Sequence, residues 1–146
     1  MRRKNLKPRV FFNASVILSG LHSPSGGSGK LLALVKQKQI SGIISEIILD
    51  EVLRHADKIG LKKTTVEKRI LSLFTPVYPA PKHEFVQKYM YIVLDQGDAH
   101  VLASSHKTNA DFLVTLDKKH LLILQNKMKA TNIVSPKELL VRLSRK

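Results

Sequence analysis

Hydrophobic residues form short runs along the chain, and polar turns separate them. Residues 9–18, RVFFNASVIL, are apolar almost throughout, which is typical of a strand covered on both faces. Shorter apolar runs at 42–44, 112–115 and 131–134 indicate further strands. The hydrophobic pattern therefore predicts several buried strands rather than a helical bundle.

Segments with helical spacing alternate with these strands. Two of them begin with a capping box, Thr64 with Glu67 and Ser135 with Glu138, and the second also has proline at the first helical position. Taken in order, the predicted helices are 31–40, Ser45 to about Gly60, Thr64 to about Leu73, 82–94, one that begins near Asp98, and one that begins at Ser135.

This alternation of short strands and helices implies right-handed crossovers and parallel strand pairing. We therefore predict an α/β fold, with a central parallel sheet between two helical layers in a three-layer α/β/α arrangement. A chain of 146 residues with 43% hydrophobic residues can close one hydrophobic core. We expect residues 1–146 to form a single domain.

The charge balance points to a polyanionic partner. The chain carries 25 Lys and Arg against 11 Asp and Glu, a formal net charge of +14. Such an excess attracts phosphate backbones through counterion release. With no cysteine, no signal-peptide pattern and no apolar run long enough to cross a bilayer, we expect a cytoplasmic protein with no membrane partner.

The glycine-rich stretch SPSGGSGK invites comparison with a phosphate-binding loop. That motif needs glycine five positions before Gly29 and Ser or Thr after the lysine, but Pro24 and Leu31 stand there. The spacing excludes the motif, and the stretch is better explained as a turn that leads into a helix.

Polar residues follow the predicted strands or lie on the helices beside them. In open α/β sheets, functional groups gather outside the carboxyl ends of the strands, so we expect these side chains to meet at one edge. They are Asn13 and Ser15 after the first strand, Glu51 on the helix after the second, Asp98 at the start of a helix, and Thr115 and Asp117 after the third.

Three carboxylates without cysteine form the environment that Mg²⁺ or Mn²⁺ prefers, since hard cations bind oxygen ligands. On a basic protein such a site is typical of phosphodiester hydrolysis. Taken singly, Asp98 is as easily explained as a helix cap and Asp117 as a turn residue. A transition-metal site with His100 or His120 is disfavoured, because their spacing matches no established ligand motif.

The chain resembles the PIN-domain family, in the branch described as toxin components of toxin–antitoxin pairs. The segments that carry the resemblance are, in order, RVFFNASVILSGLHSP, a helix ending in DEVL, GDAHVLAS, ADFLVTLDKKHL and IVSPKELL. The resemblance covers nearly the whole chain, and it implies an Mg²⁺- or Mn²⁺-dependent ribonuclease. It further implies RNA as substrate, an antitoxin partner and a homodimer.

By this resemblance the acidic positions fall on Glu51, Asp98 and Asp117, while Ser15 and Thr115 match polar positions that orient ligands or phosphate. The first acid of the family falls on Asn13. An amide offers a carbonyl oxygen but no charge, so we expect weaker binding of a divalent ion. Asn13 is either the natural residue of a weakened or silent domain, or an Asp-to-Asn change of the kind used to express a toxic nuclease.

Two other functions remain open from the sequence. One is a catalytically silent PIN domain that binds RNA or a protein. The other is a nucleotide-binding or receiver-like α/β domain, in which Asp98 or Asp117 serves as the acid near a phosphate. The first predicts RNA binding without cleavage, and the second predicts nucleotide binding or phosphoryl transfer.

Overall fold

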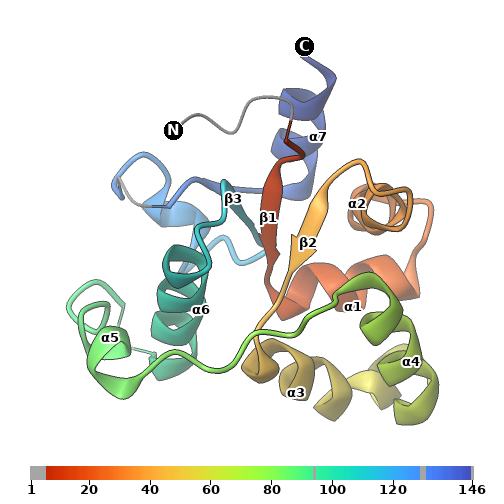
Figure 1. Ribbon diagram of the computed structural model, residues 1–146, viewed down its shortest axis with the longest axis horizontal. Coiled ribbons are helices and arrows are strands. Elements are labelled where there is room, and N and C mark those ends of the chain that lie inside the picture. The colour runs from red at the N-terminus through yellow and green to blue at the C-terminus, as the bar shows by residue number, and fades with distance from the viewer. Residues whose placement is uncertain (1–5, 94, 129–130, 146) are drawn as a thin grey trace.

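A computed structural model of the chain describes residues 6–93, 95–128 and 131–145. Its centre is a four-stranded sheet in the order β2-β1-β3-β4. The strands are β1 (Arg9–Phe12), β2 (Ser41–Ile43), β3 (Phe112–Val114) and β4 (Ile133–Val134), and each neighbouring pair is parallel. The predicted parallel α/β sheet is therefore confirmed. Because all neighbouring pairs are parallel, the four strands end at the same edge, and Figure 1 shows β1, β2 and β3 in this arrangement.

Helices cover the sheet on both sides and complete the predicted three-layer α/β/α arrangement. Figure 1 shows α6 beside β3 with α5 on the outer side of α6, and α1, α2 and α4 on the side of β2. The helices are α1 (Ala14–His22), α2 (Gly27–Lys36), α3 (Glu46–Arg54), α4 (Lys63–Leu73), α5 (His83–Gln87), α6 (Gln96–Lys107) and α7 (Pro136–Ser144), with short 3₁₀ turns η1 (Ala56–Ile59) and η2 (Leu122–Leu124). In the described part of the chain, no helix is long and apolar enough to span a bilayer.

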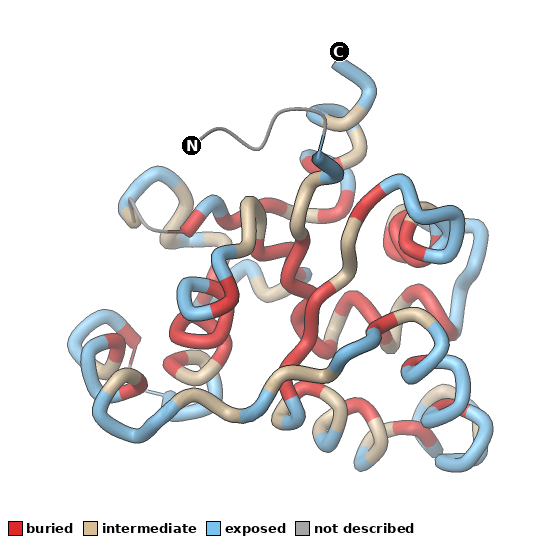
Figure 2. Tube along the Cα trace, in the orientation of Figure 1, coloured by how far each residue is buried: buried red, intermediate tan, exposed pale blue. Residues whose placement is uncertain are grey.

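The core is built on the two central strands, which are buried on both faces (Figure 2). Val10, Phe11 and Phe12 in β1 have no exposed surface, and Leu113 and Val114 in β3 match them. Burial of such side chains contributes roughly 1.5–3 kcal/mol each. A rigid, buried pair of strands therefore fixes the positions of the residues that directly follow them.

The strand predicted for residues 9–18 is wrong beyond Phe12. Asn13 has extended backbone angles, and its side chain accepts a hydrogen bond from the Ala14 N–H, so it caps helix α1. Residues of α1 are buried on more than one face, and this removes the polar stripe that would have marked a helix. An apolar run cannot distinguish a buried strand from a buried helix by periodicity alone.

Several predicted helix boundaries are also corrected. Helix α2 begins at Gly27, four residues before the expected 31. The Thr64 capping box is wrong, because α4 begins at Lys63 and its N-cap, Lys62, makes no side-chain hydrogen bond. Within the described residues 82–93, only α5 is helical, and turns follow it; residue 94 lies outside the described residues. The helix expected near Asp98 begins at Gln96.

Other caps are confirmed. The Ser45 hydroxyl accepts the Ile48 N–H at the start of α3, and Ser135 and Glu138 form the predicted reciprocal capping box with Pro136 at the first position of α7. In the glycine-rich stretch, a Cβ at Gly29 would overlap the backbone of Pro24. This glycine is therefore required for packing, which agrees with the exclusion of a phosphate-binding loop.

Candidate functional site

A cleft of about 370 Å³ lies at the carboxyl edge of the sheet, where β1 and β3 end. Helix α3 contributes Glu51 to its wall, and the first turn of α6 contributes Gly97 and Asp98. The described lining residues are Asn13, Ser15, Glu51, Asp95, Gly97, Asp98, Val101, Leu116 and Asp117. Five of the six residues singled out from the sequence thus line one cleft, and the sixth, Thr115, lies directly behind it.

Asn13 is nearly buried and uses both ends of its side chain. Its Oδ1 accepts the Ala14 N–H at 2.9 Å, and its Nδ2 donates to the Thr115 Oγ1 at 2.8 Å. The carbonyl thus caps helix α1, while the amide nitrogen holds a buried hydroxyl. The side chain is fixed at the cleft by contacts that do not need an ion.

Thr115 links the ends of the two central strands. It has no exposed surface, and its Oγ1 accepts a second hydrogen bond from the Asp117 N–H at 3.1 Å. One hydroxyl therefore receives donors from Asn13 and Asp117. Thr115 positions the backbone on both sides of the cleft without lining it.

Asp117 is oriented by a local turn. Its Oδ1 accepts the backbone N–H groups of Lys119 and His120, at 3.1 and 2.9 Å. Its Oδ2 lies 3.4 Å from the Nδ1 of His120. One carboxylate oxygen is thus held by the backbone, and the other faces the imidazole.

Helix α6 places Asp98 in the cleft, and Asp95 caps that helix by accepting the Asp98 N–H at 3.1 Å. Burial raises the pKa of the Asp98 carboxyl above its usual value. The negative charges of Asp95 and Asp117 raise this pKa further, His120 opposes them, and Glu51 adds a smaller increase. A cation in the cleft would relieve this repulsion.

Asp98, Asp117 and His120 each offer one ligand atom, and these atoms all lie within 4.8 Å of one another. Such a group can share a single cation. Glu51 lines the same cleft and raises the pKa of Asp98, but it lies outside this closest group.

Ser15 contributes through a hydroxyl on the first turn of α1. Its Oγ accepts the Leu116 N–H at 3.3 Å and so ties this helix to the loop after β3. Since Asn13 and Ser15 both line the cleft, the amino-terminal end of α1 faces it. Helix amino termini favour negatively charged groups such as phosphate.

The structure adds two residues that sequence reasoning did not select. His120 had been disfavoured because its spacing from Asp117 matches no known motif, yet the turn after β3 brings the two side chains together. Asp95 could have been found, because an aspartate three residues before Asp98 is a helix-cap signal. His100 is separate from the group, and its pKa is lowered by burial and by His83.

An α/β fold with an acidic cleft at the carboxyl edge of a parallel sheet defines a class of proteins that bind ligands at strand ends. Within this class, the family model described as PIN domain matches residues 9–119. The chain belongs to the PIN-domain family. The match includes Asn13, Glu51, Asp98 and Asp117 and ends just before His120.

Solved structures support the same fold. One is the crystal structure of VapBC2 from Rickettsia felis bound to a DNA fragment from their promoter. The similarity covers 86% of this chain and 97% of that chain, with a TM-score of 0.61 and 15% sequence identity. No curated protein matches this chain significantly.

Proposed function

We propose that this chain is a PIN-domain endoribonuclease of the toxin type that depends on a divalent ion and is weakened by Asn13. The observation that carries this proposal is the cluster of Asp98, Asp117 and His120, whose ligand atoms lie within 4.8 Å of one another at the carboxyl edge of the sheet. Burial, and then the nearby charges of Asp95 and Asp117, raise the pKa of Asp98 in this cluster. Membership of the PIN-domain family supports the same reaction class.

The side chains present fit a divalent ion. Asp98 and Asp117 would hold it, with His120 as a further ligand and Glu51 as a carboxylate that binds through water. Two carboxylates suit Mg²⁺ or Mn²⁺, and an imidazole shifts the preference toward Mn²⁺. When bound, such an ion lowers the pKa of a water and stabilises negative charge on phosphate.

Asn13 occupies a position whose geometry would accept aspartate without rearrangement. An aspartate there could still accept the Ala14 N–H, and its second oxygen could accept the Thr115 hydroxyl where the amide now donates. The hydroxyl would still accept the Asp117 N–H. The Asn-to-Asp difference is therefore mainly one charge beside the ion site.

Charge and helix geometry support RNA as the substrate. The net charge of +14 attracts a polyanion, and the amino terminus of α1 with Ser15 faces the acidic cleft. We expect Ser15, at the start of α1, to contact a phosphate beside the ion. Thr115 acts from behind by fixing Asn13 and Asp117.

We also infer an antitoxin partner and a homodimer. The solved structure of VapBC2, which shares the fold, is described as bound to promoter DNA, and this fold-level likeness agrees with the toxin-type resemblance of the sequence. An antitoxin that covers the cleft would block access of RNA to Asp98 and Asp117. Co-expression of a cleavage-active variant with a candidate antitoxin would test this partner, and we expect the yield of the variant to rise.

A catalytically silent PIN domain is the second candidate, and one observation favours it. Both polar ends of the Asn13 side chain are already engaged by Ala14 and Thr115, so the residue is stable without an ion. A domain of this kind would bind RNA or a protein through its basic surface and cleave nothing.

Cleavage of a mixed RNA substrate with Mn²⁺ distinguishes the two candidates. We expect the Asn13→Asp variant to cleave at least about tenfold faster than the unchanged chain, because a charged ligand is restored. The control is the double variant Asn13→Asp, Asp98→Ala, which should be inactive. If Asn13→Asp binds RNA but does not cleave it, the silent-domain function replaces the nuclease.

A further inference from the structure

A second cavity, of about 550 Å³, lies at the opposite end of the sheet from the acidic cleft. It opens beside Ser41 at the start of β2, between the end of α2 and the end of α4. Its described lining residues are Lys7, Val35, Lys36, Lys38, Ile40, Ser41, Gly42, Ser72, Leu73 and Thr75. None of these lining residues is acidic, and three are lysines.

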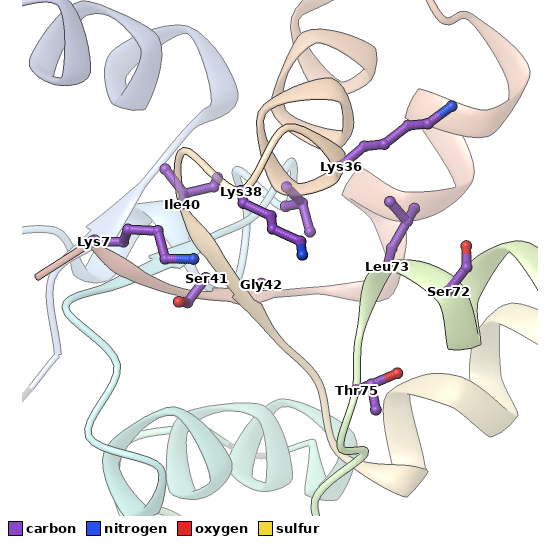
Figure 3. A pocket seen from close by; sticks show the side chains of 10 residues that line it. Lys7, Lys36, Lys38, Ile40, Ser41, Gly42, Ser72, Leu73 and Thr75 are labelled. Carbon is purple, nitrogen blue, oxygen red and sulfur yellow. The ribbon is translucent and has the colours of Figure 1, made fainter.

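The donors of this cavity converge on Ser41 and Gly42. Figure 3 shows the ammonium groups of Lys7 and Lys38 directed into the space over these two residues, whereas Lys36 points away. Among the described residues, Lys36 and Lys38 form no ion pair. The charge of Lys38 is therefore available to an incoming anion.

The backbone of β2 adds another donor. β2 is an edge strand of the described sheet, and the Ser41 N–H bonds to Pro8 on the side of β1. Successive residues of a strand turn their backbone groups to opposite sides, so the Gly42 N–H faces the free edge where the cavity lies. Gly42 has to be glycine, because a Cβ there would lie 2.6 Å from the Phe74 ring.

The hydroxyls differ in what they can offer. Ser72 and Thr75 donate to the carbonyls of Arg69 and Leu71 and so present only acceptor lone pairs to the cavity. The Ser41 hydroxyl makes no hydrogen bond within the described residues, and it can donate. The donors at the Ser41 end of the cavity are therefore the ones that an anion would meet.

Lys38 also has an unusual backbone conformation. The Lys38 N–H bonds to the Val35 carbonyl and the Gln39 N–H bonds to the Leu34 carbonyl, the pattern that ends a helix with a left-handed residue. Glycine is the common residue at that position, yet Lys38 occupies it with φ of 61°. This backbone conformation sets the direction in which the Lys38 side chain leaves the helix end beside the cavity.

We propose that this cavity is a second anion site that binds a phosphate group through Lys38, the Ser41 hydroxyl and the Gly42 N–H. The phosphate belongs either to a polynucleotide backbone or to a free phosphate compound, and the chemistry of recognition is the same. This site does not depend on the proposed nuclease activity. Its residues lie at the other edge of the sheet, and none of them lines the acidic cleft.

The test follows the Ser41 and Gly42 amide signals by NMR in phosphate-free buffer with EDTA, while inorganic phosphate is added. We expect saturable shifts at these amides, and we expect Lys38→Gly to weaken phosphate binding by roughly fivefold or more. Lys38→Gly suits the local backbone, so lost binding cannot be ascribed to unfolding. Lys137→Ala, an exposed lysine that lines none of the described cavities, is the charge-matched control and should bind normally.

A second arm replaces inorganic phosphate by a short single-stranded oligoribonucleotide. Shifts at Gly42 that depend on Lys38 identify a polynucleotide as the source, and shifts with inorganic phosphate alone identify a free phosphate. The alternative role for these lysines is to discourage pairing of the open edge strand with other chains. If neither probe shifts Gly42, or if Lys137→Ala weakens binding as much as Lys38→Gly, the site is refuted, whatever the result of the RNA cleavage experiment.

Discussion

The two ends of the sheet carry opposite charges and hold them in different ways. At the carboxyl edge, Asp98 and Asp117 are fixed by a helix cap and by backbone N–H groups. At the amino-terminal edge, Lys36 and Lys38 have no ion pair among the described residues. An ion needs ligands in set positions, whereas a phosphate can be bound by mobile point charges. The fold therefore preorganises one edge and leaves the other adaptable.

The acidic edge is the more costly one to build. Burial raises the pKa of Asp98, and repulsion by the carboxylates of Asp95 and Asp117 raises it further, on a protein whose net charge is strongly positive. Such local repulsion is typical of functional sites. The lysine edge carries no comparable cost except the left-handed backbone of Lys38.

Thr115→Val should have the largest effect on stability, because it disrupts the hydrogen bonds that hold the carboxyl edge in place. The substitution removes the acceptor of the Asn13 Nδ2 and Asp117 N–H groups, and we expect a loss of about 2–3 kcal/mol in the free energy of unfolding. Urea denaturation measures the effect. Thr115→Ser keeps the hydroxyl and serves as the control, and equal losses in both variants would show that the hydrogen bonds are not what matters.

Asp98→Asn tests how much the charge of Asp98 destabilises the carboxyl edge. Because the folded protein raises the pKa of Asp98 above 3.8, the charged form destabilises the fold once the pH rises through the folded pKa. Without divalent ions, the variant should be more stable than the parent at pH 7, and the difference should disappear below pH 3.8.

Addition of Mn²⁺ should make the parent chain more stable than the Asp98→Asn variant at pH 7. An ion that binds only the folded state stabilises it by about 2.7 kcal/mol at a hundredfold excess over its Kd, and Asp98→Asn should lose most of this gain. Thermal unfolding with and without Mn²⁺ measures both quantities. Equal Mn²⁺ stabilisation of the two proteins would place the ion elsewhere.

Lys38→Gly should have a smaller effect, of opposite sign to Thr115→Val. Removal of the side chain relieves a left-handed residue and should raise the free energy of unfolding by roughly 1 kcal/mol. Chemical denaturation at high salt isolates this backbone term from charge effects. A loss of stability would mean that the Lys38 side chain supports the fold itself.

The smallest expected effect lies outside both cavities, at the α7 cap. Hydrogen bonding from the Ser135 backbone lowers the pKa of Glu138, so its contribution is present above pH 4.5 and is lost as the pH falls through the folded pKa. Glu138→Gln should cost about 0.5–1 kcal/mol at pH 7 and less at acidic pH. A loss that does not vary with pH would exclude the charge as its cause.

The sequence predicted the parallel sheet because short strand segments, such as the largely apolar 112–115 and TNIV at 131–134, alternate with helical segments. It could not predict where the first strand ends, since the apolar residues of α1 continue the run after Asn13. It also missed the short length of α5, because the apolar residues after Gln87 pack as turns rather than as a helix.

For the candidate site, the rule that strand ends meet at one edge was enough to gather Asn13, Ser15, Glu51, Asp98 and Asp117. The rule cannot reveal contacts made by turns, and His120 reaches Asp117 only through the turn after β3. The lysine cavity was equally hidden, because Lys7, Lys38 and Ser41 belong to separate elements with no shared motif.

The measurement that tests the central claim most directly is calorimetric titration of Mn²⁺ into the unchanged chain, the Asn13→Asp variant and Asp117→Asn. The account predicts weak binding by the unchanged chain, binding at least about tenfold tighter with Asn13→Asp, and none with Asp117→Asn. Identical affinities in all three proteins, or no binding by Asn13→Asp, would contradict a divalent-ion site at the carboxyl edge of this sheet.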